Sequence, residues 1–266
     1  MAVYLASGFQ VSITRACRVV DLPKSMFYYC STKDDSAVIN KLKELSEQRP
    51  TEGQDKYFQR IRLESLPWNH KMVSRVYRQM GLHIRKKGKR RIPARVKTPL
   101  AQPQQTNTTW SMDFMHDCLM NGRKYRILNI LDDCNRKAIA VEADFSFPAE
   151  SVNQVLKHAI HEYGRPASIR VDNGPEFLSS VFTLFCEQQG IKVQYIQPGK
   201  PMQNGYIERF NGTLRRNFLN ANLFESLYDF RQKRDPWLED YNNYRPHESL
   251  GNVPPNQFLL QEQKLN

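Results

Sequence analysis

Three carboxylates, Asp113, Asp172 and Glu208, are the residues of this 266-residue sequence whose types and positions best suit chemistry. Asp113 lies within the apolar run 110–115, where a buried carboxylate is costly unless another group compensates its charge. Asp172 directly follows the predicted strand 168–171, and Glu208 lies on an amphipathic segment. Such residues supply the oxygen ligands that Mg²⁺ prefers, and two ions about 3.5–4 Å apart stabilise the attacking and leaving oxygens of a phosphoryl displacement. If the fold brings them together, we expect metal-assisted chemistry at phosphorus.

The elements that must position these carboxylates form an α/β domain. The pattern predicts strands at 110–115, 126–131, 137–143, 168–171 and 191–196, and helices at 149–163, 176–189 and 202–219. A three-strand meander followed by crossover units is the order of the ribonuclease H-like fold, a mixed five-stranded sheet with helices. In that fold the first and fourth strands are neighbours and the last helix packs across them. We therefore expect Asp113, Asp172 and Glu208 to converge.

Two helices of this domain carry patterned side chains. Helix 176–189 is expected to face the core with Phe177, Val181, Leu184 and Phe185. Helix 202–219 has an apolar stripe that consists of Ile207, Phe210, Leu214 and Ala221. A second stripe presents Asn204, Glu208, Asn211 and Arg215 in line. The apolar stripe should anchor this helix on the sheet, and the polar stripe suits metal and DNA phosphate.

The excess positive charge lies entirely in the first 100 residues, which carry 21 Lys and Arg against 8 Asp and Glu. This asymmetry favours an anionic polymer as partner, although a solubilising basic face is the alternative. Helices are predicted at 12–19, 23–29 and 36–47, and another between Asn69 and Gly81; the first two resemble a helix-turn-helix. Arg75 lies on the exposed side of the last of these, where phosphate contact and a merely solvated face are equally supported.

A basic segment follows the helices, since eight of the thirteen residues 85–97 are Lys or Arg. We interpret it as a linker that tracks DNA, through Arg85, Lys86, Lys87, Lys89, Arg90 and Arg91. The predicted organisation is a helical DNA-binding region at 1–83, this linker at 84–105, the catalytic core at 106–225 and a helical extension at 226–266.

Several classes of protein are excluded or disfavoured. No apolar run is long enough to cross a bilayer, and the first ten residues do not read as a secretory signal. Five scattered cysteines without a CxxC pair fit a reducing cytosol and offer neither a zinc site nor a disulfide framework. The phosphate-binding GxxxxGK[ST] motif of ATP-driven enzymes and the HxxR pair of tyrosine recombinases do not occur in the sequence.

Three sequence blocks carry a family resemblance: 110–114 (WSMDF), 172–177 (DNGPEF) and 203–210 (QNGYIERF), with 35 residues between Asp172 and Glu208. Together with the block 241–247 (YNNYRPH), they resemble the DDE transposases of bacterial insertion sequences, in their catalytic second-frame form within the retroviral integrase-like superfamily. Residues 51–62 match the usual pattern of that family only loosely.

The resemblance implies that Asp113, Asp172 and Glu208 bind two Mg²⁺ ions, for which Mn²⁺ can substitute. Water then nicks the end of the element, and the freed 3′-hydroxyl attacks another phosphodiester. Asn204, Arg215 and Lys200 would contact DNA. The implied partners are double-stranded DNA, both terminal inverted repeats and target, an upstream-frame protein fused by frameshifting, and further copies in a synaptic complex. The place of action would be the bacterial cytoplasm, at the nucleoid and away from membranes.

Other interpretations remain open at this stage. The domain could be another nuclease of the same fold, with Asp132 or Asp133 as further ligands, or a DNA-binding regulator with an inactive catalytic domain. His158 and His161 could hold a metal but are expected at the surface. Trp237, Tyr241 and Tyr244 could stack on bases, but burial of a small helix is the simpler expectation. For His247, a role in a turn and a contact with the catalytic core are equally supported.

Overall fold

The computed structural model describes residues 1–29, 34–84, 102–197 and 201–258, without the side chains of residues 201 and 202. The basic residues expected to contact DNA between Arg85 and Arg91, and Lys200, lie outside these described residues. Contacts group the chain into two compact units, Met1–Lys41 and Leu42–Asn266. The four-region division drawn from the sequence stays a prediction.

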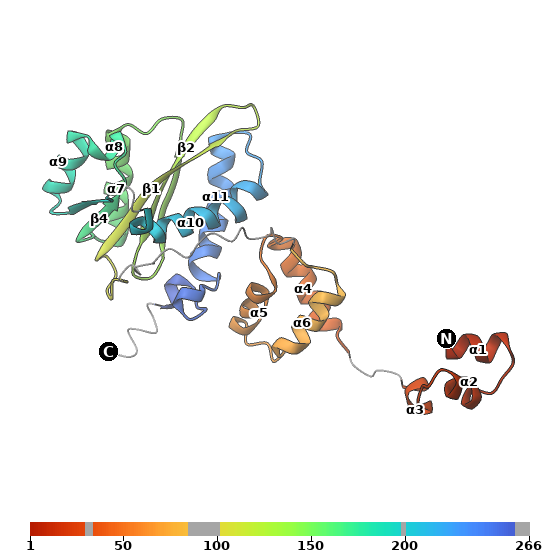
Figure 1. Ribbon diagram of the computed structural model, residues 1–266. Coiled ribbons are helices and arrows are strands. Elements are labelled where there is room, and N and C mark those ends of the chain that lie inside the picture. The colour runs from red at the N-terminus through yellow and green to blue at the C-terminus, as the bar shows by residue number, and fades with distance from the viewer. Residues whose placement is uncertain (30–33, 85–101, 198–200, 259–266) are drawn as a thin grey trace. The chain divides into compact units, whose positions relative to one another are not determined.

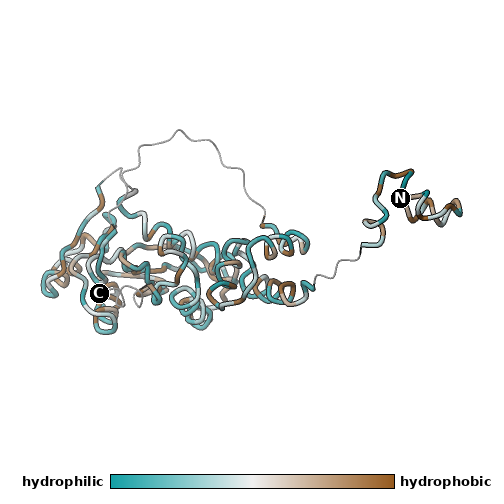
Figure 2. Tube along the Cα trace, turned by 90° about the horizontal axis from the view of Figure 1, so that it is seen from below, coloured by the Kyte–Doolittle hydropathy of each residue, from teal (hydrophilic) through white to brown (hydrophobic). Residues whose placement is uncertain are grey.

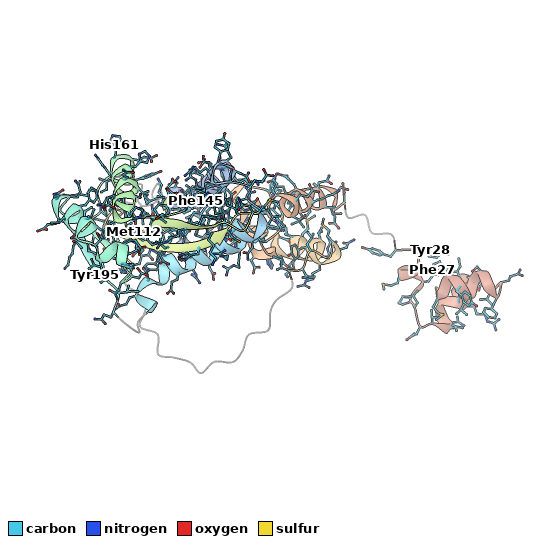
Figure 3. All side chains as sticks on the ribbon, turned by 90° about the horizontal axis from the view of Figure 1, so that it is seen from above. Phe27, Tyr28, Met112, Phe145, His161 and Tyr195 are labelled. Atoms are coloured by element: carbon cyan, nitrogen blue, oxygen red, sulfur yellow. The ribbon has the colours of Figure 1, made fainter. Side chains whose placement is uncertain are left out.

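The first unit contains three short helices, α1 (Ala2–Gly8), α2 (Ile13–Val19) and α3 (Lys24–Phe27), followed by the start of α4 (Ser36–Gln48) (Figure 1). The hydroxyl of Ser12 caps α2 by accepting a hydrogen bond from the backbone N–H of Arg15 (3.3 Å). Asp21 turns the chain between α2 and α3 with a φ of 52°. At the end of α3, the rings of Phe27 and Tyr28 meet edge to face, with their centroids 5.1 Å apart (Figure 3). The predicted pair of helices around a tight turn is therefore present.

The second unit begins with the remainder of α4, then α5 (Gln54–Leu63) and α6 (His70–Gln79). As expected, Asn69 caps α6, and its Oδ1 accepts a hydrogen bond from the N–H of Met72 (2.8 Å). Helix α5 was not predicted. It starts at Gly53 without a side-chain cap, and only Tyr57 and Ile61, one turn apart, are apolar and fully buried, so its local signal is weak.

The core of this unit is a five-stranded sheet with the order β3-β2-β1-β4-β5. Its strands are β1 (Thr109–Cys118), β2 (Lys124–Asp132), β3 (Ala138–Asp144), β4 (Ser168–Val171) and β5 (Lys192–Tyr195). Strands β1, β2 and β3 pair antiparallel, whereas β4 runs parallel to both β1 and β5. This mixed sheet, with β1 beside β4, confirms the arrangement expected from the sequence.

Two hydrophobic clusters cover the two faces of the sheet. The first holds Trp110 and Met112 of β1 together with α7 (Ala149–Tyr163), α8 (Pro175–Leu178) and α9 (Ser180–Gln188). The second joins β2 and β3 to α10 (Gly205–Asn217) and α11 (Leu227–Asn243). Short 3₁₀ turns, η1 (Pro201–Asn204), η2 (Leu219–Ala221) and η3 (Glu248–Leu250), flank α10 and follow α11. The sheet is thus sandwiched between helices, and hydrophobic residues occur both in its strands and in the helices that cover it (Figure 2).

Two helical predictions need correction. The expected helix 176–189 is interrupted at Ser179, whose extended backbone ends α8 and whose hydroxyl caps α9. Because the break shifts the helical phase, Phe182 and Cys186 are buried, while Val181 and Leu184 are 38% and 55% exposed. The second correction concerns the helix expected at 202–219, which is α-helical only over Gly205–Asn217. Ile207, Phe210 and Leu214 of its predicted apolar stripe are buried. Ala221, the fourth residue of that stripe, lies in η2 and is exposed.

No helix in the described part of the chain is both long enough and apolar enough to cross a membrane. This agrees with the hydropathy of the sequence.

Candidate active site

The three carboxylates come from adjacent parts of the sheet and from the helix packed on it. Ser111 of β1 is in register with Arg170 of β4, so Asp113 and Asp172, each two residues further along parallel strands, reach the same level. Side chains alternate along β1, and Trp110 and Met112 fill the cluster under α7. Asp113 therefore projects to the other face, the face that α10 covers.

Asp113 is half-buried and bonded to its surroundings. Its Oδ1 accepts a hydrogen bond from the N–H of Phe114 (2.9 Å), and its Oδ2 accepts one from Nδ2 of Asn211 on α10 (2.6 Å). Oδ1 of Asn211 in turn accepts from Nδ2 of Asn129 (2.7 Å), which is fully buried on β2, directly opposite Asp113. Two amides thus fix the position of this carboxylate between sheet and helix.

The other two carboxylates act on Asp113 electrostatically. Burial, together with the negative charges of Asp172 and Glu208, raises the pKa of Asp113 to about 6, against the hydrogen bonds from Phe114 and Asn211, which lower it. Asp172 is also half-buried, and its Oδ1 accepts a hydrogen bond from the N–H of Gly174 (3.0 Å), whereas Glu208 is exposed in the first turn of α10. The structure therefore gathers the three predicted residues into one acidic region.

The carboxylates of this acidic region do not have the spacing of a metal centre among the described residues. Among the described residues, no three His, Cys, Asp or Glu side chains lie close enough together to hold an ion. The residues nevertheless suit a hard divalent cation, because like charges destabilise the ionised form of Asp113, and a cation between them would reverse that effect.

Residues 103–201 and 189–255 each match a family described as an integrase core domain. The chain is 35% identical over 250 residues to a 31.7 kDa protein of insertion element IS407 from Burkholderia multivorans, covering 93% of this chain and 90% of the relative. It is 26% identical to the transposase InsD of insertion element IS2 from Escherichia coli, covering 86% and 80%.

The chain belongs to the DDE transposases of bacterial insertion sequences. It is thus a polynucleotidyl transferase of the integrase type, a family that cleaves DNA and transfers strands. A simian T-cell lymphotropic virus intasome, solved by cryo-electron microscopy with the PP2A regulatory subunit B56 gamma, is similar in fold, with a TM-score of 0.53 at 19% identity over 81% of this chain and 73% of that one.

The polar stripe of α10 in the transposase is mostly engaged within the protein. Nη1 of Arg215 forms an ion pair with Asp117 (2.9 Å), and its Nη2 donates to the carbonyl oxygen of His116 (2.5 Å), so Arg215 ties α10 to the end of β1. Asn204 is buried, and its Oδ1 has no hydrogen-bond partner among the described residues. Arg75 is exposed on α6. DNA contact by these three residues stays a prediction.

Sequence reasoning missed Asn129 as a member of the site. It is the one amide in the otherwise apolar run of β2 up to Leu131, and a polar residue at such a position needs a buried partner. That signal could have found it.

Asp132, the last residue of β2, and Asp133, the first residue of the turn that follows, are bonded within the fold. Asp133 is fully buried, and its two oxygens accept from the hydroxyl of Ser111 (2.6 Å) and from Nη1 of Arg170 (2.6 Å). Asp132 accepts from the backbone N–H groups of Asn107 and Cys134 (both 2.8 Å). Each of their four carboxylate oxygens thus accepts a hydrogen bond within the fold, as expected of residues at a turn.

The exposure of the remaining candidate residues can be compared with what the sequence led us to expect. His161 projects outward from α7 (Figure 3), and His158 is likewise exposed. Tyr241 is buried and Trp237 is half-buried, as expected of a packed helix, but Tyr244 is 61% exposed, which contradicts the burial expected for it. The reason is that α11 ends at Asn243, so Tyr244 is already outside the helix that packs.

His247 belongs to the turn after α11. Its backbone bridges to Val253, and its ring lies edge-on to Tyr241 at 4.7 Å. Burial, together with the nearby charges of Arg245, Lys56 and Arg136, lowers the pKa of His247 to about 3.

This neutral histidine predicts a pH effect on stability. The unfolded chain takes up the proton below pH 6.5 and the folded chain does not until about pH 3, so stability is complete above 6.5 and declines as pH falls. Between pH 7 and pH 5, the free energy of unfolding should drop by about 2 kcal/mol through this group. Urea titrations at both pH values should show that His247→Gln lacks this drop and that His158→Gln keeps it. An equal pH dependence in all three proteins would contradict the burial.

Proposed function

We propose that this transposase cleaves DNA at the ends of its insertion sequence and joins the freed 3′-hydroxyl to target DNA, with Asp113, Asp172 and Glu208 as the ligands of two Mg²⁺ ions. The observation that carries the proposal is the convergence of these three carboxylates, from β1, from the end of β4 and from α10. The bound ions would stabilise the attacking and leaving oxygens of an in-line displacement.

The chain itself supplies position and charge. The amide of Asn211, itself held by Asn129, orients Asp113, whose carboxylate lies within electrostatic reach of Asp172 and Glu208. The ion pair between Arg215 and Asp117 holds α10 across β1, which keeps Glu208 over the carboxylates of the sheet. Such preorganised groups act without reorganisation during the reaction.

The partners follow from this activity. We propose that the substrates are the terminal inverted repeats and target DNA, that the chain works as an oligomer in a synaptic complex, and that it acts on the nucleoid in the cytoplasm. We also propose that an upstream-frame protein, joined by frameshifting, contributes to recognition of the ends. The excess positive charge of the first 100 residues supports an anionic partner.

A cleavage and strand-transfer assay tests this function directly. Duplexes that carry the element's own ends are incubated with the chain alone and with the chain fused to its upstream frame, in Mg²⁺, in Mn²⁺ and with chelator. Metal-dependent nicks followed by joined products are the expected result. DNA binding without any metal-dependent product, in both forms, would instead indicate a regulator.

The basic linker predicts a strong salt dependence of DNA binding. Replacing the eight Lys and Arg residues of 85–97 by glutamine should weaken binding and flatten the plot of log K against log salt, because each lost phosphate contact removes about 0.9 from its slope. Fluorescence anisotropy at several salt concentrations measures the slope. A slope equal to that of the wild type would exclude this segment from DNA contact.

A further inference from the structure

Helix α10 has two functional flanks on either side of its buried face. At about 100° per residue, Ile207, Phe210 and Leu214 face the core, and Glu208 lies on one flank of them. The other flank holds a separate row, one or two turns apart: Tyr206, Arg209, Thr213 and Arg216. This second row faces away from the carboxylates.

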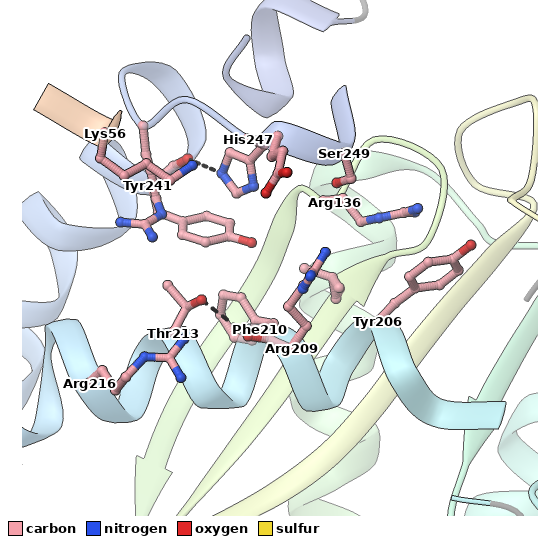
Figure 4. Close-up of a pocket in the computed structure, with 13 residues that line it drawn as sticks. Lys56, Arg136, Tyr206, Arg209, Phe210, Thr213, Arg216, Tyr241, His247 and Ser249 are labelled. Atoms are coloured by element: carbon pink, nitrogen blue, oxygen red, sulfur yellow. Dashed lines mark hydrogen bonds between the residues drawn. The ribbon is translucent and has the colours of Figure 1, made fainter. Parts of the chain in front are cut away.

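The second flank forms one wall of a pocket of about 280 Å³ (Figure 4). The opposite walls come from α5, from the turn after β2 and from the segment after α11. Five cationic side chains line the pocket: Lys56, Arg136, Arg209, Arg216 and Arg245. The residues that line the pocket include one carboxylate, that of the exposed Glu248. The pocket is therefore strongly electropositive.

Three of these cations are held in place by the protein. The guanidinium of Arg136 stacks on the ring of Tyr206 at 3.6 Å, and Arg245 forms an ion pair with Glu52. Nζ of Lys56 donates to the carbonyl oxygen of Pro246 (2.5 Å). Burial, and then the charge of Arg245, lowers the pKa of Lys56 to about 8, in agreement with an excess of positive charge.

Arg209 and Arg216 differ from these three. Both are exposed at the pocket, and among the described residues neither guanidinium has an ion pair or a hydrogen bond. Two guanidinium groups without a protein partner, beside three cations that the protein holds in place, suit a bound phosphate. Each planar guanidinium offers parallel N–H donors to its oxygens.

We propose that this pocket binds a phosphodiester of the DNA on which the transposase acts, at a subsite on the far flank of α10 from the carboxylates. The proposal rests on the proposed function and names a second contact of the same substrate. A helix with its side chains is about 10–12 Å across, so the bound phosphate should lie within a few nucleotides of the scissile one.

The test compares two variants with equal charge loss. Arg209→Gln/Arg216→Gln removes the free guanidiniums, and Lys157→Gln/Lys192→Gln removes two exposed charges on α7 and β5. In fluorescence anisotropy with an end duplex, the first variant should reduce the salt slope by about 1–2 and the affinity about tenfold, while the second stays near the wild type. An affinity and slope equal to those of the second variant would overturn the proposal.

Replacing single DNA phosphates by neutral methylphosphonates locates the contact. Single methylphosphonates are placed at each of the first nucleotides around the cleavage position. One substitution should weaken binding by the wild type and have no further effect on Arg209→Gln/Arg216→Gln. Equal losses in both proteins at every position would overturn the subsite. Joined products formed by the wild type in the same preparation show that the proposed function holds, so failure of the subsite is distinguishable from failure of the activity.

Discussion

Glu208→Gln is expected to abolish DNA cleavage and strand transfer while DNA binding persists. The glutamine keeps the size and the helical propensity of the side chain but removes the charge that would hold a cation against Asp113 and Asp172. Loss of a metal interaction worth several kcal/mol corresponds to a rate decrease of ~10³-fold or more. The measurement is the yield of nicked and joined product on end duplexes, with anisotropy for retention of DNA.

Folding is not expected to change, because Glu208 is exposed and substitutions at such sites stay within about 0.5 kcal/mol. Glu239→Gln, at an exposed position of α11, is the matched control and should retain full activity. Asp172→Asn should reproduce the loss. Substantial cleavage by either Glu208→Gln or Asp172→Asn would remove these residues from the proposed metal site.

The strands of the sheet could be predicted from the sequence because each strand has a local pattern of apolar and polar residues. The alternation along β1 places Trp110 and Met112 on one face and Asp113 on the other, and the polar position after Val171 marks the end of β4. Helix α7 was predicted with its bounds at Ala149 and Tyr163, since its apolar spacing and Gly164 agree on the same end.

Where a single residue overrides the pattern, the prediction fails. Apolar spacing continues through 176–189, yet Ser179 takes an extended conformation and starts a new helix with its own hydroxyl. A serine that can cap a helix competes with helix continuation, and the break lets both Phe177 and Phe182 pack in one core.

The active-site amides show a second limit. Asn211 was recognised on the stripe of α10, but its bond to Asn129 joins residues 82 positions apart, and no local pattern pairs them. The same holds for the C-terminal block 241–247, whose Arg245 turned out to bind Glu52 near the start of α5. Motif recognition identified these residues, and only the fold explains what each one contacts.

The largest effect on stability is expected from substitution of Arg60, which also binds Glu52. Its Nε and Nη2 donate to the carboxylate of Glu52 (2.8 and 2.9 Å), and its Nη1 and Nη2 donate to that of Asp240 on α11 (2.9 and 2.8 Å). All three side chains are nearly inaccessible, since Arg60 is 7% exposed, Glu52 4% and Asp240 8%. The network therefore fastens α5 to the helix that packs on the catalytic sheet.

Arg60→Met keeps the volume but leaves two buried carboxylates short of a partner. Removing one member of such a network costs about 3–5 kcal/mol, more than the interaction itself contributes, because the remaining charges stay desolvated. Urea unfolding should report this loss, and limited proteolysis should show earlier cleavage within residues 52–84. Arg62→Met, two positions along the same helix and exposed, is the control and should stay within about 0.5 kcal/mol of the wild type.

Partial rescue would identify the cause of the loss. In Arg60→Met/Asp240→Asn the second substitution removes one of the stranded charges, so the double variant should be less destabilised than the sum of the two single variants by about 1 kcal/mol or more. Strictly additive losses would mean that Arg60 stabilises α5 through packing alone. Coupling would instead establish that the charge network of Arg60, Glu52 and Asp240 joins α5 to α11 and so to the sheet of the catalytic core.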